Sequence, residues 1–258
     1  MPIDFHTEQN RYTYATRQAH VSWQRAITAL VEPQGKRVVD IGCGGGIYAQ
    51  AWAHLGAASV RGVDFAAQMV QVATEGARHL PQISFSQGNA LNTGLPDGCA
   101  DIVFARALVH HVGDLPACLA EAYRLLSPGG VYIIQDRTLE DVRIPGSREH
   151  LRGYFFSCFP RLLAVEAARR PHAETVLAAL AHAGFTQAQS TVCWEIRQTY
   201  PDAEALSADL RQRTGRSILH ELSDAELARL IDVITAQLPA HTPVVEQDRW
   251  TLWWAARP

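Results

Sequence analysis

Runs of β-forming residues alternate with helical stretches between Lys36 and Asp136. Because parallel strands need a long crossover connection, usually a helix, this alternation predicts an α/β fold with a mostly parallel sheet covered on both faces. The expected strands are Arg37–Ile41, Ser59–Asp64, Ile83–Gln87, Ile102–Ala105 and Val131–Gln135. Apolar residues three and four positions apart predict helices between them, over Ile47–Leu55, Ala66–Leu80 and Leu115–Leu126.

The segments that flank this core contain further elements. An amphipathic helix is expected before it, over Thr16–Val31. A helix over Ala173–Ala183 and two more strands, over Gln189–Gln198 and Arg249–Ala255, are expected after it. In the segment between those two strands, Ser223 and Glu226 have the spacing of a capping box at the start of a helix.

The length of 258 residues suits a single α/β domain. We therefore predict one domain over residues 1–258, with its core over residues 15–136. Residues 137–170 and 201–240 are expected to form helical insertions that cap the sheet and contact a substrate.

Composition argues against several classes of function. The net charge of −3 provides no basic field that would attract nucleic acid or an anionic membrane. The five cysteines and the histidines show no metal-ligand spacing, so no metal is expected. The sequence has no run of 18 apolar residues, and its first residues lack the apolar region of a signal peptide. A cytoplasmic protein without nucleic-acid or membrane partners is expected.

The segment VVDIGCGGG, Val38 to Gly46, leads from an apolar strand into a turn with four glycines. Glycine destabilises regular structure, so such a turn is typical of a site where a ligand approaches the backbone. Dinucleotide-binding enzymes favour G-x-G-x-x-G, but here Ile47 replaces the third glycine. The spacing is instead Asp40-x-Gly42-x-Gly44-x-Gly46, with a carboxylate inside the motif.

Two polar residues follow the next two strands. Asp64 ends the second strand, where a carboxylate can accept hydrogen bonds from both hydroxyls of a ribose. Asn89 follows the third strand, where an amide can contact an adenine edge. A structural interpretation stays open for each, since Asp64 could cap the helix at Ala66 and Asn89 could be a turn residue.

Four segments, by their order and spacing, resemble class I S-adenosylmethionine-dependent methyltransferases of the ubiquinone- and menaquinone-biosynthesis ("type 11") subgroup. They are VVDIGCGGG, VRGVDFAAQMVQVA, FSQGNALNTGLP with DIVFARALVHHVGD, and EAYRLLSPGGVYIIQD. The resemblance implies a Rossmann-like three-layer sandwich whose seven-stranded sheet has an antiparallel last strand. It also implies S-adenosyl-L-methionine as the cofactor, S-adenosyl-L-homocysteine as its product and a small-molecule methyl acceptor.

The resemblance also implies which residues bind the cofactor. Asp40, Gly42, Gly44 and Gly46 would approach its methionine part, and Asp64 would hold the ribose hydroxyls. Phe65, Met69, Asn89 and Ala90 would surround the adenine, with Asn89 at a position where the family more often has aspartate. Arg106 would lie near the sulfonium, and Tyr14 and Arg17 would close over the cofactor.

Candidate residues for the acceptor lie beyond the fourth and fifth strands. His110 is a candidate general base, because histidine titrates near neutral pH. His111, Arg137, Tyr154 and Phe155 are candidates for contact with the acceptor, and arginines beside aromatics suit a planar or amphipathic molecule. Packing roles for these side chains remain open.

Two other functions remain possible from the sequence. A noncatalytic S-adenosylmethionine-binding protein would have the same cofactor residues. An NAD(P)-dependent oxidoreductase is disfavoured by Ile47 and by the absence of a Tyr-x-x-x-Lys motif, since Lys36 is the only lysine. The acceptor is expected to be the only partner besides the cofactor, and the chain to be a monomer or homodimer.

Overall fold

The fold is built around a seven-stranded sheet in the order β3-β2-β1-β4-β5-β7-β6. The structure is a computed structural model, and it describes residues 17–239 and 242–258. The strands are β1 (Arg37–Ile41), β2 (Ser59–Asp64), β3 (Ile83–Gln87), β4 (Ala100–Arg106), β5 (Leu126–Asp136), β6 (Thr186–Tyr200) and β7 (Val244–Ala256). Strands β1 to β5 are parallel, and β7 is antiparallel to its neighbours β5 and β6. The predicted fold class is confirmed.

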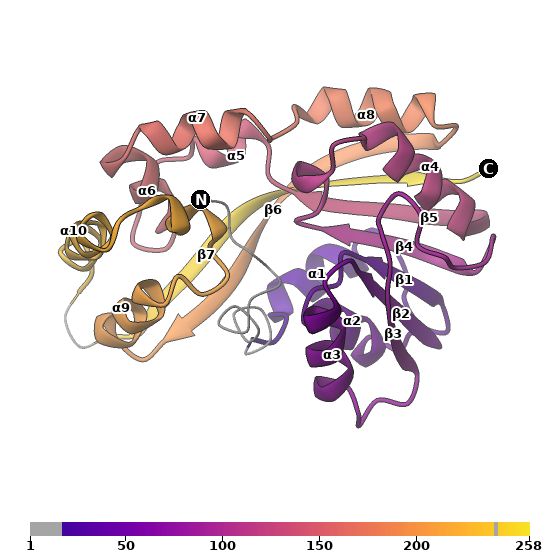
Figure 1. Ribbon diagram of the computed structural model, residues 1–258, viewed down its shortest axis with the longest axis horizontal. Coiled ribbons are helices and arrows are strands. Elements are labelled where there is room, and N and C mark those ends of the chain that lie inside the picture. Colours follow the sequence, from indigo (N-terminus) through magenta and orange to yellow (C-terminus); the bar gives the residue numbers. More distant parts are fainter. Residues whose placement is uncertain (1–16, 240–241) are drawn as a thin grey trace.

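Helices cover both faces of the sheet, because successive residues of each strand point to opposite faces. Val38 belongs to a buried cluster with Trp23 and Trp52, and its neighbour Val39 belongs to a second cluster with Leu119 and Leu180. The first cluster packs under α1 (Val21–Thr28) and α2 (Ile47–His54), and the second under α4 (Leu115–Leu125) and α8 (Ala173–His182). Figure 1 shows these two layers, with α3 (Ala67–Gly76) beside α2.

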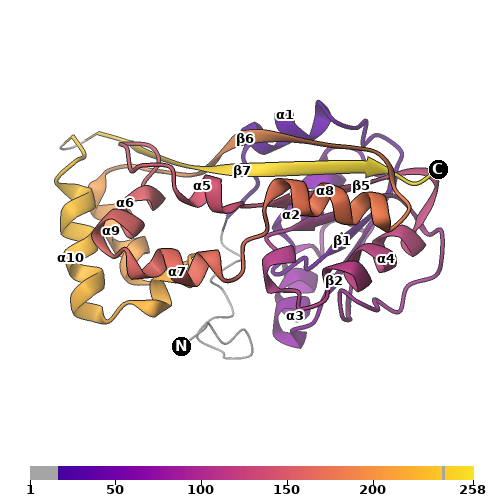
Figure 2. The ribbon, with the colours of Figure 1, turned by 90° about the horizontal axis from the view of Figure 1, so that it is seen from above.

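Strands β6 and β7 are longer than predicted and connect the sheet to a helical cap. They pair along their whole length, from Thr186 opposite Ala256 to Tyr200 opposite Val244. Their far halves extend beyond the other strands to the cap, as Figures 1 and 2 show. The cap consists of α5 (Leu139–Val142), α6 (Arg152–Cys158), α7 (Arg161–Ala167), α9 (Ala203–Arg211), the 3-10 helix η3 (Ser217–Glu221) and α10 (Asp224–Thr235). A third buried apolar cluster holds these helices together.

Some boundaries differ from the prediction for local reasons. Helix α1 begins at Val21 rather than Thr16, because the imidazole of His20 caps it by accepting a hydrogen bond from the Ser22 amide at 3.1 Å. Helix α3 ends at Gly76, before the predicted Leu80. The capping box is confirmed, since the side chains of Ser223 and Glu226 each bond to the other residue's backbone at the start of α10.

Candidate active site

A cavity of about 590 Å³ lies at the carboxyl ends of β1, β2, β4 and β5, beside the cap. In α/β proteins with parallel sheets, ligands bind at this edge. Residues of the glycine-rich turn, of both strands β6 and β7 and of the cap all contribute to its wall. The cavity thus brings together most of the predicted site residues.

The glycine-rich turn leaves its backbone open to this cavity at Gly44. Gly42 and Gly44 have φ angles of 73° and 51°, in the left-handed region that favours glycine. A Cβ atom placed on Gly44 would meet nothing within 4 Å, whereas on Gly42 it would lie 2.9 Å from Leu108. At Gly44, therefore, a ligand can approach the main chain more closely than at Gly42.

Gly46, in contrast, does not line the cavity. It is the N-cap of α2 with φ 80°, and a Cβ there would lie 2.9 Å from the ring of Phe85 and 3.0 Å from Ala73. The expectation that Gly46 approaches the cofactor is therefore corrected. This glycine is needed because α3 and β3 pack closely against the turn.

Asp64 connects the end of β2 to the glycine-rich turn. One oxygen of its carboxylate accepts a hydrogen bond from the Gly44 amide at 2.8 Å, and the other accepts one from the Ala66 amide at 3.0 Å. The side chain is buried but lines the cavity. Through these two bonds Asp64 orders both backbone segments, and its side chain forms part of the cavity wall.

The predicted adenine-binding residues Phe65, Met69, Asn89 and Ala90 all line the cavity. Met69 is buried, while the Phe65 side chain is 52% exposed at the surface of the cavity. Asn89 forms a local turn, in which its side-chain oxygen accepts a hydrogen bond from the Leu91 amide at 2.9 Å. Within the chain, Asn89 therefore acts as a turn residue, as the structural interpretation predicted. Asn89 and the neighbouring Ala90 both line the cavity.

Asp40, at the end of β1, has an incomplete set of partners. Its side chain is 2% exposed, and Oδ2 has no hydrogen-bond partner among residues 17–239 and 242–258. Burial and then the nearby Asp64 carboxylate raise the pKa of Asp40 to about 7. A buried carboxylate with an unpaired oxygen facing a cavity is suited to a positively charged group of a ligand.

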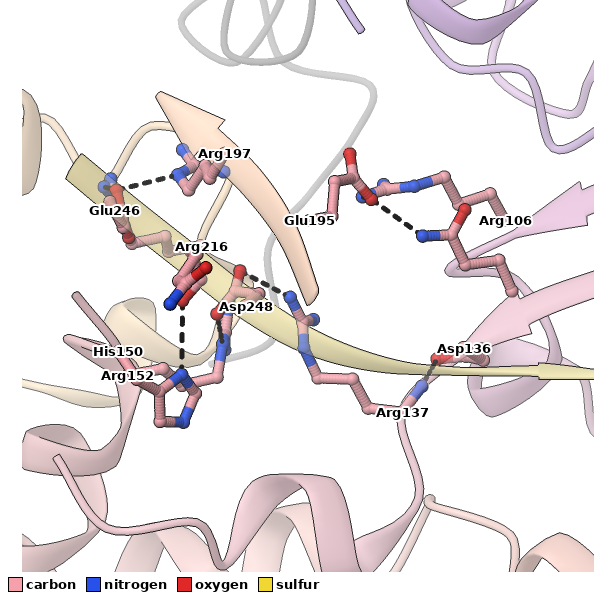
Figure 3. Close-up of polar contacts among 12 residues, drawn as sticks. Arg106, Asp136, Arg137, His150, Arg152, Glu195, Arg197, Arg216, Glu246 and Asp248 are labelled. Carbon is pink, nitrogen blue, oxygen red and sulfur yellow. Dashed lines mark hydrogen bonds and ion pairs between the residues drawn. The ribbon is translucent and has the colours of Figure 1, made fainter. Parts of the chain in front are cut away.

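Arg106 lies at the centre of a polar network between the sheet and β6. It donates a hydrogen bond to Glu195 at 2.9 Å, and Glu195 also accepts bonds from Tyr48 Oη and from the Gln135 amide. The guanidinium carbon of Arg106 lies 4.2 Å from the ring centre of Tyr48 and 4.1 Å from that of Trp250. Figure 3 shows the Arg106–Glu195 pair. Arg106 is thereby held rigidly in the cavity wall.

His110, in the 3-10 helix η2 (Val109–His111), is oriented by Asp136 at the end of β5. Its Nδ1 lies 2.8 Å from Asp136 Oδ2, and Arg170 donates to the same carboxylate at 2.6 Å. Burial lowers the pKa of His110, outweighing the opposite effect of Asp136, so the imidazole is neutral at neutral pH. The Nδ1–H group then donates a hydrogen bond to Asp136, and Nε2, which has no hydrogen-bond partner in the described part of the chain, is available to a ligand.

Three other predicted residues are Arg17, His111 and Tyr14, of which the first two line the cavity. Arg17 lines the cavity and donates a hydrogen bond to the backbone oxygen of Arg197 at 3.2 Å. His111 also lines the cavity, with its ring centre 4.0 Å from that of His110. Tyr14 lies outside the described residues.

Of the three cap residues predicted to contact an acceptor, only Arg137 lines the cavity. Phe155 is fully buried in the apolar cluster of the cap. Tyr154 packs against the same cluster and covers Gly146, where an added Cβ would lie 2.7 Å from its ring. The assignment of Tyr154 and Phe155 to the acceptor site is therefore corrected, since both side chains pack the cap together.

Several residues of the wall were missed by the sequence analysis. They are Tyr48, Arg152, Arg170, Glu195, Arg197, Asp248 and Trp250. A signal exists for those on β6 and β7, because Glu195 and Arg197, and likewise Glu246, Asp248 and Trp250, occupy alternate positions and are all buried. Alternation places them on one face of a strand. Arg152 and Arg170 carry no comparable local signal.

Neither a metal-binding group nor a membrane-spanning helix occurs among the described residues. Within the two described segments, no group of three or more His, Cys, Asp or Glu side chains is placed to hold a metal ion. None of the helices over the same residues has both the length and the apolar character that crossing a membrane requires.

Comparison with known proteins places the chain among methyltransferases. A family model described as a methyltransferase domain matches residues 39–134, which run from within β1 to within β5. The malonyl-[acyl-carrier protein] O-methyltransferase of Pectobacterium atrosepticum is 30% identical over 217 residues, which cover 81% of this chain and 78% of that protein.

Solved methyltransferase structures share the fold. A putative methyltransferase from an antibiotic biosynthesis pathway of Anabaena variabilis superposes with a TM-score of 0.72 at 21% identity, covering 94% of this chain and 99% of that one. Phosphoethanolamine N-methyltransferase 2 of Haemonchus contortus, solved in complex with S-adenosyl-L-methionine, superposes with a TM-score of 0.63 at 16% identity. That alignment covers 99% of this chain but 60% of the Haemonchus chain. From the sequence relationship, and in agreement with the fold, the chain belongs to the family of S-adenosylmethionine-dependent methyltransferases.

Proposed function

We propose that the chain transfers a methyl group from S-adenosylmethionine to a small molecule that attacks through an oxygen, nitrogen or carbon atom and binds beside the cap. The observation that carries this proposal is a cavity lined both by Asp40, with its unpaired oxygen beside the glycine-rich turn, and by His110, which Asp136 orients from behind the wall. One end of the cavity suits a cationic cofactor, and the other contains a group that can accept a proton.

The residues at the glycine end fit the cofactor chemically. The ammonium group of its methionine part would supply the missing partner of Asp40 Oδ2. The open backbone at Gly44 would allow close approach, and Asp64 would accept bonds from the ribose hydroxyls. We assign the remaining contacts to Arg17, Gly42, Phe65, Met69, Asn89, Ala90 and Arg106, all of which line the cavity.

The acceptor end of the cavity provides a base. When bound, the cofactor supplies an activated methyl group, so the protein must align the acceptor, exclude water and remove a proton. His110 Nε2 would take that proton while the acceptor's electron pair forms the bond to the methyl carbon and the carbon–sulfur bond breaks, its electron pair staying on the sulfur. Asp136 would then stabilise the resulting imidazolium through its hydrogen bond to Nδ1.

Binding of S-adenosylhomocysteine, measured by calorimetry, tests the cofactor site. We expect Asp64→Ala to weaken it at least about tenfold, because charge-assisted bonds to the ribose are lost. Asp232→Ala on the exposed side of α10 is the matched control and should bind as the wild type does. Binding of NADH in place of S-adenosylhomocysteine, or unchanged affinity in Asp64→Ala, would refute the assignment.

Formation of S-adenosylhomocysteine separates an enzyme from a protein that only binds the cofactor. The wild-type protein is incubated with S-adenosylmethionine and small phenolic, amine, carboxylic and carbon-acid acceptors. At least one acceptor should raise the rate above that without acceptor. No increase with any of these classes, in a protein that binds the cofactor, would favour the noncatalytic alternative.

A further inference from the structure

The wall of the cavity has opposite charges at its two ends. The glycine end carries Asp40 and Asp64, whereas the cap end carries Arg137, Arg152 and Arg197. All of these side chains are buried. The acidic end suits a cationic cofactor. The buried arginines at the basic end require a different, anionic ligand or a counter-ion within the chain.

Most buried arginines of the wall have a carboxylate that balances their charge. The pairs are Arg106 with Glu195 at 2.9 Å, Arg170 with Asp136 at 2.6 Å and Arg197 with Glu246 at 3.3 Å. Glu246 is shared with Arg216, but Arg216 has a second carboxylate partner in Asp209. These groups leave no uncompensated charge.

Arg137 and Arg152, in contrast, share one carboxylate. Arg137 Nη2 donates to Asp248 Oδ2 at 2.6 Å, and Arg152 Nε donates to Asp248 Oδ1 at 3.0 Å, as Figure 3 shows. The three side chains are 7%, 7% and 4% exposed. Two guanidinium groups against one carboxylate leave one positive charge without a counter-ion in a buried place, which is unfavourable. Burial, and then the proximity of Arg152, lower the pKa of Arg137 to about 9.

The same two arginines have hydrogen-bond donors without acceptors. Arg137 Nε is buried and unpaired within the described residues. Arg152 donates to Asp248 through Nε, and neither of its terminal nitrogens bonds to any described part of the chain. A guanidinium presents five donors in a planar fork that matches the oxygens of a carboxylate or phosphate. The ring of Trp250 lies 3.6 Å from the Arg137 guanidinium carbon and holds that group in place.

We propose that Arg137 and Arg152 bind an oxyanion, a carboxylate or phosphate group, that the methyl acceptor carries. This inference rests on the methyltransferase function proposed above and defines the acceptor class. Arg137 and Arg152 line the same cavity as His110, and the Arg137 amide donates a hydrogen bond at 2.8 Å to Asp136, the partner of His110. The acceptor would be anchored by its anionic group and present its nucleophilic atom to the methyl group.

The test titrates inorganic phosphate or malonate into the protein saturated with S-adenosylhomocysteine, at constant ionic strength, with calorimetric detection. Both anions should bind, and the neutral analogue malonamide should not. Arg152→Gln should lower the affinity for both anions by about tenfold or more, because a charge-assisted bidentate contact is lost. The control Arg148→Gln, an exposed arginine of the same segment, should leave their affinity unchanged.

Folding does not confound this comparison. Arg152→Gln leaves Asp248 paired with Arg137, so its melting temperature should stay at or above that of the wild type. Should that variant nevertheless melt earlier, Arg152→Lys keeps the charge and loses the fork, and it should still bind both anions more weakly.

Three results would overturn the inference: neither anion binds, Arg152→Gln binds both as the wild type does, or it loses affinity for S-adenosylhomocysteine rather than for the anions. The last result would assign the arginines to the carboxylate of the cofactor. Because S-adenosylhomocysteine binding is measured first, its failure would count against the proposed function, and failure of the anions alone would count against the oxyanion site.

Discussion

At the scale of single residues, the site combines groups that the chain leaves unsatisfied. Asp40 keeps an unpaired buried oxygen, and Arg137 an unpaired buried nitrogen, among the residues that the structure describes. Buried polar groups without partners are rare in folded proteins because they cost stability. Where several of them line one cavity, their positions indicate which ligand groups are bound there.

A residue-scale prediction concerns His110. If Nε2 accepts the proton, His110→Ala should lower kcat by about 100-fold and leave the affinity for S-adenosylhomocysteine unchanged. Only the neutral imidazole accepts a proton, so the wild-type rate should rise with pH through the pKa of His110. Because burial lowers that pKa, the rise should lie below the ordinary value of 6.5, with a plateau at neutral pH.

The pH profile of kcat distinguishes this role from packing. The variant should lose the rising limb, whereas His54→Ala, an exposed histidine at the end of α2, should retain it. A His110→Ala protein with near-normal kcat and the wild-type pH profile would show that His110 only packs against Asp136.

At the scale of elements, the sheet core was predictable because its signals are local. β1, β2 and β3 have the predicted boundaries, since each is a short β-forming run bounded by turn residues. β6 and β7 are longer than predicted because their ends pair only with each other and extend into the cap. That length depends on contacts distant in sequence, which no local pattern shows.

The same contrast holds for the site. Asp64 and Asn89 were predicted because they lie at or just after the ends of neighbouring strands that meet at one edge of the sheet, and Asp40 was predicted from the family resemblance of the glycine-rich motif. The partners of the arginines were missed, because the contact between Arg152 and Asp248 joins residues that are 96 positions apart. Tyr154 and Phe155 were misassigned, because aromatic side chains in a helix face the apolar core as readily as a cavity.

Phe155 provides the prediction for the cap. Because its ring is buried in the apolar cluster of the cap, Phe155→Leu should lower the free energy of unfolding by roughly 1 kcal/mol. The affinity for phosphate in the S-adenosylhomocysteine complex should not change. Chemical denaturation and calorimetry measure the two quantities. A variant with wild-type stability and a weakened anion site would restore Phe155 to the acceptor site.

At the scale of the whole molecule, the two halves of the fold contribute different groups to the cavity wall. The parallel half of the sheet presents the glycine-rich turn and the acidic residues, and the long β6–β7 pair brings charged side chains and the cap to the same cavity. Because the β6–β7 pair joins the cap to the sheet, the cap can differ between related proteins while the cofactor-binding end of the sheet stays the same. The central claim is that this single cavity holds the cofactor at its acidic end and the acceptor at its basic end.

The most direct test is a crystal structure of the protein with S-adenosylhomocysteine and phosphate. The account predicts the ammonium group of the product within hydrogen-bond distance of Asp40 Oδ2, the ribose hydroxyls at Asp64 and the adenine beside Phe65 and Asn89. Phosphate should lie between Arg137 and Arg152. A product molecule bound in the reverse direction, with its amino-acid end at Arg137 and Arg152, would contradict the account.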